Sequence, residues 1–155
     1  MRLTLYTDLS LRLLMFLAVR TKDLATIQDA AERYRVSRNH LMKVARQLGM
    51  AGFIETVRGR GGGLRLSRPA SEIRIGDVVR TTEEDFRMVE CFDPDTNTCP
   101  LISICRLRGA LGEALGAYLA VLDKYTLADL AAEGREIRQI LALSPTPPRR
   151  RVPAL

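Results

Sequence analysis

Three features are scarce in this sequence, and each scarcity excludes a class of protein. The chain has one histidine and three cysteines, and its longest apolar run near the start, residues 9–19, is interrupted by Ser10 and Arg12. That run is too short to cross a bilayer, and no basic segment and small-residue cleavage site frame it as a signal peptide. We therefore expect a cytoplasmic protein without a membrane partner.

The few cysteines and the single histidine also limit the chemistry. An odd number of cysteines is a poor set for disulfides, and a reducing compartment disfavours them, so metal binding and thiol chemistry remain. The sequence shows no grouping of Cys, His and Asp that is typical of a nucleophilic enzyme, and its glycine-rich run 59–63 lacks a Gly-Lys-Ser/Thr nucleotide motif. We expect that the protein is not an enzyme.

Positive charge is concentrated in one quarter of the chain. The formal net charge is +6, from 24 Lys and Arg against 18 Asp and Glu. Between Glu32 and Arg68, nine basic and two acidic residues carry +7, which leaves −1 for the rest. A local basic excess is typical of a surface that binds DNA, because each cation that neutralises a phosphate releases counterions. A solvated basic face without a partner is the alternative.

Hydrophobic spacing in the first third of the chain predicts three helices. A wide apolar stripe indicates a core helix over about 7–20, and Thr26 and Ser37 are typical N-caps of two shorter helices that end near 34 and 49. The turn at 35–36 makes these two a helix-turn-helix. In the second one the apolar and polar side chains take opposite faces, as in a recognition helix, although an ordinary amphipathic helix has the same pattern. Its candidate DNA-contacting residues are Ser37, Arg38, Asn39, His40, Lys43 and Arg46.

A basic hairpin is expected next. Residues 53–57 and 64–66 are β-prone, and the glycine-rich segment 58–63 joins them. Glycines permit the positive φ angles of a hairpin turn, and Arg58 and Arg60 at its tip are placed to reach a phosphate or the minor groove. A basic hairpin after a helix-turn-helix is the wing of a winged-helix DNA-binding domain.

The rest of the chain predicts a homodimer. We expect a short helix after Pro69 that ends near 84, an irregular stretch over 88–102, a long helix over about 103–125, and a short helix within 126–132. The long helix is apolar on more than one side, and a symmetric dimer is the commonest way to cover such a helix. The expected organisation is one mainly α unit with a small β-hairpin wing: a winged helix-turn-helix over 1–85, a cysteine-bearing loop over 86–105, a dimerisation helix and C-terminal segment over 103–135, and a disordered tail over 144–155.

The cysteines form one group. Cys91, Cys99 and Cys105 all lie in a 15-residue window before the long helix. Closed zinc sites usually have closer cysteine pairs or a histidine partner, whereas three thiolates with an open fourth position suit an iron-sulfur cluster. Spacing alone leaves open a cluster, a zinc or thiol sensor, and ordinary structural cysteines.

Several blocks of the sequence resemble one family of regulators. The blocks are 3–8, 36–41 (VSRNHL), 57–66, 73–80 (IRIGDVVR), 105–107 and 125–130 (YTLADL). They are similar to the NsrR family of nitric-oxide-sensitive repressors, in the winged-helix superfamily that also contains IscR and RirA, and the resemblance covers nearly all of 1–132. IscR-like members have a histidine three residues after the third cysteine; this chain has Arg108 there, which argues against a 2Fe-2S site of that type. The seven-residue spacing from Cys91 to Cys99 also resembles RirA-type iron regulators.

The resemblance implies a site and a function. The implied ligands of a 4Fe-4S cluster are Cys91, Cys99, Cys105 and Asp8 of the partner subunit. A carboxylate is a weaker partner for cluster iron than a thiolate, so that iron would be the labile corner where nitric oxide enters. Arg12, one helical turn later, would orient or neutralise Asp8 as a second-shell group. Alternatively, Asp8 is a helix-end residue stabilised by the helix dipole.

The implied function is that of a homodimeric repressor of nitrosative-stress genes. It would bind a pseudo-palindromic double-stranded DNA operator and release it when nitric oxide attacks the cluster. An iron-responsive, RirA-like regulator and a zinc or thiol sensor are the alternatives.

Overall fold

The structure, a computed structural model, describes residues 2–20 and 23–143. Its elements in chain order are α1 (Leu5–Ala18), α2 (Ile27–Tyr34), α3 (Arg38–Met50), β1 (Ile54–Val57), β2 (Gly63–Leu66), the 3-10 turn η1 (Ala70–Glu72), α4 (Ile75–Thr82), the 3-10 turn η2 (Glu90–Phe92), α5 (Arg106–Leu122), α6 (Leu127–Leu130) and α7 (Gly134–Ile140). This mainly α architecture with a two-stranded antiparallel hairpin confirms the expected fold class. None of the helices in these ranges combines the length with the hydropathy that a bilayer crossing needs. The expected tail, 144–155, lies outside the described residues.

Helix α1 is the centre of the hydrophobic core. It begins two residues earlier than expected because Thr4 caps it, with the Thr4 hydroxyl accepting the N–H of Thr7 at 3.2 Å. Leu13, Leu14 and Phe16 are completely buried, and α3, α4, α6 and β2 all contact the helix. Burying each such side chain contributes about 1.5–3 kcal/mol. Helix α3 and strand β2 are therefore held in place by their packing against α1.

Helices α2 and α3 form the expected helix-turn-helix. The Thr26 hydroxyl accepts the N–H of Asp29 at 3.0 Å, and the Ser37 hydroxyl accepts the N–H of His40 at 3.4 Å, so both predicted N-caps are confirmed. Between the helices, Arg35 takes the left-handed conformation with φ of 54°. This single residue ends α2 and turns the chain into α3.

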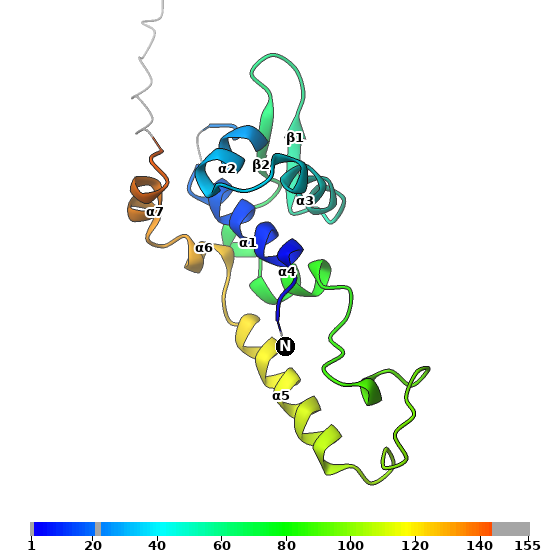
Figure 1. Cartoon of the computed structure of the whole chain (residues 1–155). Helices are drawn as coiled ribbons and strands as arrows, with labels where there is room; N and C mark the ends of the chain where they lie inside the picture. The colour runs from blue at the N-terminus through cyan, green and yellow to red at the C-terminus, as the bar shows by residue number, and fades with distance from the viewer. Residues whose placement is uncertain (1, 21–22, 144–155) are drawn as a thin grey trace, which may run out of the picture.

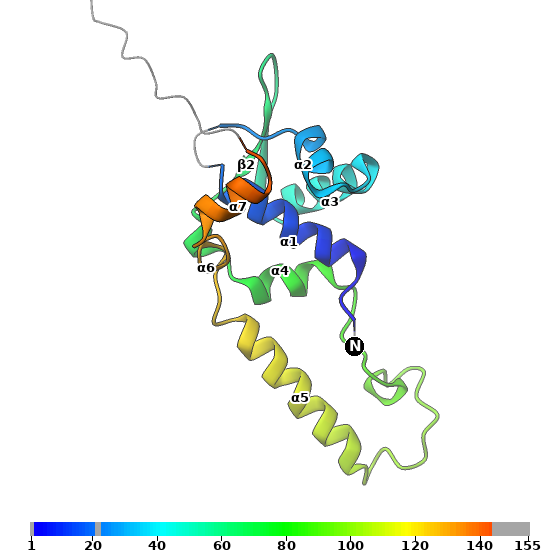
Figure 2. The same ribbon diagram turned by 60° about the vertical axis from the view of Figure 1, so that its left-hand side comes forward.

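The hairpin of β1 and β2 is the expected wing. Ile54 pairs with Leu66 and Val57 with Gly63 in an antiparallel register. The turn needs positive φ, which Gly59 supplies at 104°. The segment before α2 adds one further bridge to β2, and the hairpin tip extends beyond α2 and α3 in both ribbon views (Figures 1 and 2).

Helix α5 projects from the body of the molecule. It extends away from the winged helix as an arm in both views (Figures 1 and 2), and its described contacts are mainly with α4. No residue of α5 is buried, and Leu107 and Val121 are 65% and 49% exposed. The helix begins at Arg106, three residues later than expected, because Cys105 takes the N-cap position.

One ion pair fastens the end of this arm to α4. The Arg80 guanidinium donates to both carboxylate oxygens of Asp123, at 2.7 and 2.6 Å, and Arg74 donates to the Asp123 carbonyl at 3.1 Å. Gly76 makes room for the pair, since a Cβ there would lie 1.8 Å from Asp123 Oδ1. The arm is thus joined to the DNA-binding body through a polar joint.

The C-terminal segment returns to the body. Thr126 and Asp129 form a reciprocal capping box at the start of α6, which agrees with the helix expected within 126–132. Helix α7 was not expected from the sequence. It is a seven-residue helix without a side-chain cap, and its contacts with the body include a bond from Arg138 to the Val19 carbonyl at 3.2 Å.

Candidate DNA interface and metal centre

Helix α3 presents a rigid polar face to solvent. Leu41, Val44 and Leu48 are buried in the core and fix the helix in place. All six candidate DNA-contacting residues of the segment are exposed: Ser37, Arg38, Asn39, His40, Lys43 and Arg46. A helix that is held on one face and free on the other is the arrangement by which a recognition helix enters the major groove.

Most of the cations on α3 and the wing are not neutralised by the protein itself. Within the described residues, five of them form no ion pair with a carboxylate: Arg38, Lys43, Arg46, Arg58 and Arg60. By contrast, Arg65 pairs with Glu55, and the Arg68 guanidinium lies 5.1 Å from the ring centroid of Phe53. The unpaired cations keep their full charge available for phosphates.

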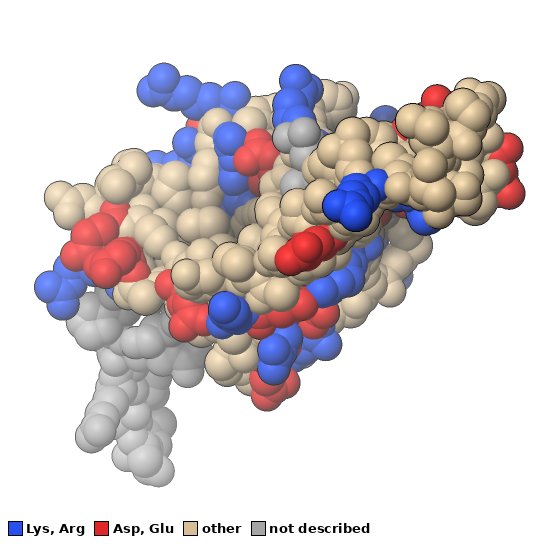
Figure 3. Space-filling model, turned by 90° about the horizontal axis from the view of Figure 1, so that it is seen from below, with Lys and Arg blue, Asp and Glu red and all other residues tan. Residues whose placement is uncertain are grey.

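The opposite end of the molecule differs in charge. Figure 3 looks at the end away from the wing, where basic and acidic side chains are interspersed and wide areas carry neither. The excess of cations lies in the sequence between residues 32 and 68, the segment that contains α3 and the wing.

The wing tip holds its two arginines outward on a tight turn. The N–H of Gly62 donates to the Gly59 carbonyl at 2.9 Å, and a Cβ on Gly62 would lie 2.3 Å from the Val57 carbonyl oxygen. Arg58 and Arg60 on this turn are both exposed. The turn is too close to the strand for a side chain at position 62, which explains the glycine there.

The loop that carries the first two cysteines is organised around a buried carboxylate. Asp93 is only 6% exposed. Its oxygens accept from the Asp95 N–H at 3.1 Å, the Thr96 hydroxyl at 3.0 Å and the Arg87 guanidinium at 2.6 Å. The hydrogen bond from the Asp95 N–H is the largest of the effects that lower the pKa of Asp93. The loop therefore has a defined local structure even though it contains little helix.

A second carboxylate joins the segments of these two cysteines. Glu90, directly before Cys91, accepts from both the N–H and the hydroxyl of Thr98, directly before Cys99, at 2.6 and 2.8 Å. The Thr98 hydroxyl is the main reason that the pKa of Glu90 is lowered. The two cysteine-bearing segments are thus held side by side by one ionised side chain.

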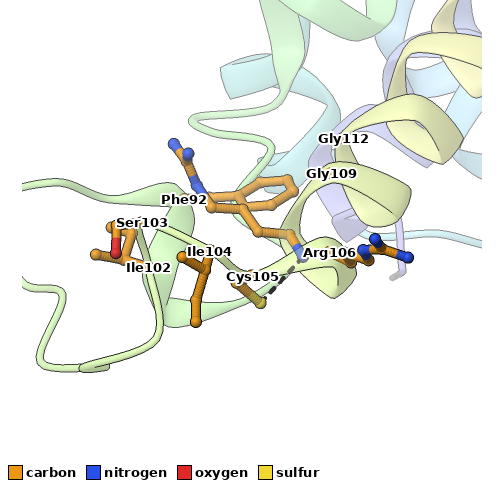
Figure 4. A pocket seen from close by; sticks show the side chains of 9 residues that line it. Phe92, Ile102, Ser103, Ile104, Cys105, Arg106, Gly109 and Gly112 are labelled. Atoms are coloured by element: carbon orange, nitrogen blue, oxygen red, sulfur yellow. Dashed lines mark hydrogen bonds between the residues drawn. The ribbon is translucent and has the colours of Figure 1, made fainter.

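The third cysteine is placed at the start of the arm. Cys105 Sγ accepts the backbone N–H of Arg108 at 3.4 Å, and the Arg108 Nε donates to the Cys91 carbonyl at 3.1 Å. Figure 4 shows Cys105 beside a surface hollow of about 660 Å³ at the base of the helix. Its lining residues are Phe92, Ile102, Ser103, Ile104, Cys105, Arg106, Arg108, Gly109 and Gly112.

The donor set fits an iron-sulfur cluster, but the side chains do not converge on one point. All three cysteines are free and half-buried, and thiolates are the ligands that such clusters prefer. The helix N-terminus at Cys105 favours a negatively charged ligand. Within the described residues, however, no three side chains of the Cys, His, Asp and Glu types form a metal-binding group. The structure brings the three cysteine segments together, but their thiols do not form a complete set of metal ligands within the described residues.

Asp8 and Arg12 form an ion pair on α1. The Arg12 Nε donates to Asp8 Oδ1 at 3.0 Å, and the second guanidinium contact measures 2.8 Å. Asp8 lies in the first turn of α1, and its side chain is 41% exposed. No ion pair or hydrogen bond within the described residues joins Asp8 to the cysteine loop of its own chain.

Sequence reasoning missed the residues that shape the loop. Glu90, Asp93 and Arg87 were not singled out, and Arg108 was noted only for the histidine that it replaces. A local signal for two of them exists, since an Asp followed by Pro, Asp and Thr is typical of an Asx turn, and an acid directly before a cysteine is readily noticed. The partners of Glu90 and Arg108 are eight and seventeen residues away, and no local pattern predicts such pairings.

A rigid helix-turn-helix with a basic wing and a projecting helix defines a winged-helix transcription regulator. Comparison with known proteins agrees: a family model described as "Rrf2: Iron-dependent Transcriptional regulator" matches residues 3–133. The chain belongs to this Rrf2 family. Members of the family are regulators and not enzymes, which confirms the expected absence of catalysis.

Individual relatives and a solved structure support the same conclusion. The chain is 54% identical over 144 residues to the HTH-type transcriptional regulator NsrR of Bacillus subtilis, covering 92% of this chain and 99% of that protein. It is 51% identical to the NsrR of Halalkalibacterium halodurans, covering 94% and 100%. The solved structure of T. potens IscR superposes with a TM-score of 0.71 at 21% identity, covering 94% of this chain and 93% of that one, and so shows the shared fold. The sequence resemblance to the NsrR family is confirmed.

Proposed function

We propose that this chain is a homodimeric, cytoplasmic repressor that binds double-stranded DNA and senses nitric oxide through an iron-sulfur cluster, most simply a 4Fe-4S cluster. The observation that carries the proposal is the tying of three cysteine-bearing segments to one another at the start of an otherwise uncovered helix. The similarity to relatives named NsrR supports it.

The exposure of α5 supports the proposed dimer. A 17-residue helix with no buried residue and exposed Leu107 and Val121 is stable only if another surface covers it. A second copy of the same helix is the simplest cover, because a symmetric interface uses one patch twice. Such a dimer would hold two α3 helices at the spacing of a pseudo-palindromic operator, about one helical turn or a multiple apart.

The residues that would hold the cluster are Cys91, Cys99, Cys105 and Asp8 of the partner subunit. When bound, the cluster would supply iron that is reactive towards nitric oxide. Arg12 holds the Asp8 carboxylate in one orientation, and Glu90 and Arg108 hold the cysteine segments. A carboxylate from the partner would tie the loop of one subunit to α1 of the other.

The connection to DNA runs through the joint between α5 and α4. The bonds from Arg80 and Arg74 to Asp123 would transmit a displacement of α5 to α4. Helix α4 packs on α1, and α1 in turn packs on α3. A coupling of about 1–3 kcal/mol between the loop and the operator site would change DNA affinity by roughly 5- to 150-fold. A small rearrangement of the dimer is therefore sufficient for release.

The test uses the dimer purified without oxygen. We expect a cluster absorption band, counted iron and sulfide, and binding to DNA recovered by in vitro selection that weakens when nitric oxide is added. Asp8→Ala should change the cluster spectrum and the nitric oxide response. Glu136→Ala, which removes another exposed acid from the first turn of a helix, should change neither. A colourless, iron-free preparation that still releases its DNA on nitric oxide addition contradicts the proposal.

An iron-responsive regulator is the second candidate, favoured by the iron-dependent description of the family. In that case iron chelation alone, without nitric oxide, should shift DNA binding over the same range. Zinc or thiol sensing at the same cysteines would respond to zinc or to a thiol oxidant in iron-free protein. DNA binding measured against each of these agents in parallel separates the three signals.

A further inference from the structure

We propose that Arg108 is a positioning residue of the cysteine site, which fixes the Cys91 segment against helix α5 and supplies a positive charge there without ligating iron. This inference rests on the proposed cluster function and extends it to a residue outside the ligand set. Arg108 stands on the first turn of α5, three residues after Cys105.

The contacts of Arg108 join two of the three cysteine segments. Its backbone N–H bonds Cys105 Sγ at 3.4 Å, and its side-chain Nε–H bonds the Cys91 carbonyl at 3.1 Å. Since Glu90 already holds the Cys91 segment to that of Cys99, Arg108 completes a chain of contacts across all three. The start of α5 and the turn η2 are held together by this one side chain.

The chemistry of the side chain suits a supporting role. A guanidinium has five N–H donors and no acceptor, so it bonds sulfur or carbonyl groups but does not ligate a metal. Only the Nε–H has a partner within the described residues, and the other guanidinium donors are free at the hollow that Cys105 lines. Hydrogen bonds to sulfur and nearby positive charge both raise the reduction potential of a cluster.

The chain offers a matched control. Arg106 stands on the same turn of α5 and lines the same hollow, and its guanidinium has no hydrogen bond or ion pair within the described residues. Arg106→Gln and Arg108→Gln therefore remove the same charge from nearly the same place, but only the second removes the bond to Cys91. Arg108→Lys keeps the charge and loses the planar group that bonds through Nε.

The first measurement uses cluster-free protein and hydrogen exchange of the backbone amides. The amides of Phe92 and Asp93 close the η2 turn around Cys91 by bonding the carbonyls of Val89 and Glu90. We expect Arg108→Gln to speed exchange at these amides, Arg106→Gln to leave it unchanged, and Arg108→Lys to restore it only in part. This measurement needs no metal, so it decides the contact even if the chain assembles no cluster.

The second measurement uses the cluster-loaded dimer. Arg108→Gln should lower the midpoint reduction potential of the cluster and weaken iron retention by roughly 10- to 100-fold, read as faster cluster loss to a chelator. Arg108→Lys should restore the potential only in part, because it keeps the charge and loses the bond through Nε, and Arg106→Gln should shift the potential less than Arg108→Gln. The proposal is overturned if Arg108→Gln matches wild type in exchange and potential, or if Arg106→Gln has equal effects. A wild-type chain that binds no cluster contradicts the proposed function instead.

Discussion

Removing the two wing-tip arginines provides a direct test of the DNA interface. Arg58 and Arg60 are exposed, and neither has an ion-pair partner within the described part of the chain. If each contacts one phosphate, each contributes about 0.9 to the slope of log affinity against log salt concentration. The double variant Arg58→Gln/Arg60→Gln removes four such contacts from a homodimer with both wings on DNA, so its slope should be smaller by about 3.6 than that of wild type.

The expected size of the effect is easily measured. Between about 50 and about 200 mM salt, a slope change of about 3.6 corresponds to roughly a 150-fold smaller loss of affinity in the variant. Fluorescence anisotropy with a labelled mixed-sequence duplex at several salt concentrations gives the slope, because phosphate contacts do not depend on base sequence.

A neutral pair on the same hairpin is the control. Arg65 pairs with Glu55 on the neighbouring strand, so Glu55→Gln/Arg65→Gln removes a cation and an anion together. We expect its salt slope to equal that of wild type. If the wing-tip variant also keeps the wild-type slope while remaining folded by circular dichroism, the wing does not contact phosphate and our reasoning from unpaired charge is wrong.

Three further predictions concern stability. Phe16→Ala empties a fully buried site at the centre of the core and should lower the free energy of unfolding in urea by about 3–5 kcal/mol. Gly76→Ala places a Cβ 1.8 Å from Asp123 Oδ1, so it should separate α5 from α4 and lower the melting temperature, whereas an unchanged melting temperature would refute the role of that joint. Thr126→Ala removes the side-chain cap of α6 and should lower the free energy of unfolding in urea by about 1 kcal/mol. The hydrogen bonds from Thr126 lower the pKa of Asp129. This carboxylate therefore stabilises the fold above its unfolded pKa of about 4, and that stabilisation is lost as the pH falls through its lower folded pKa. In urea titrations at several pH values, Asp129→Asn should lack this part of the pH dependence of the free energy of unfolding.

Local patterns predicted the DNA-binding half of the molecule well. The caps at Thr26 and Ser37 and the buried spacing of Leu41, Val44 and Leu48 are short-range signals, and the structure places each of them as expected. The start of α5 was misplaced, because a cysteine is not a usual N-cap and the sequence before it is apolar. Helix α7 was missed because it is short and owes its position to contacts with α1.

For the candidate metal centre, the sequence predicts which cysteines are the sulfur donors but not which side chains hold their segments together. The spacing of Cys91, Cys99 and Cys105 singles out the sulfur donors, since residue type and clustering are properties of the chain itself. The supports of these donors, above all Glu90 and Arg108, depend on bonds across eight and seventeen residues. Such bonds are set by how the loop folds back on the helix.

By itself, the order of residues determined the class of the domain, the segment in which cations are concentrated and the three thiols that could bind a metal, because helix caps, hydrophobic periodicity and charge act over a few neighbours. Tertiary structure alone decided which cations remain unpaired, how Gly76 admits the Arg80 and Asp123 pair, and which side chains hold the cysteine segments together. The physical reason is that these features require groups separated in the chain to meet, and they meet only once α4 has packed on the core around α1 and the cysteine loop has folded back on α5.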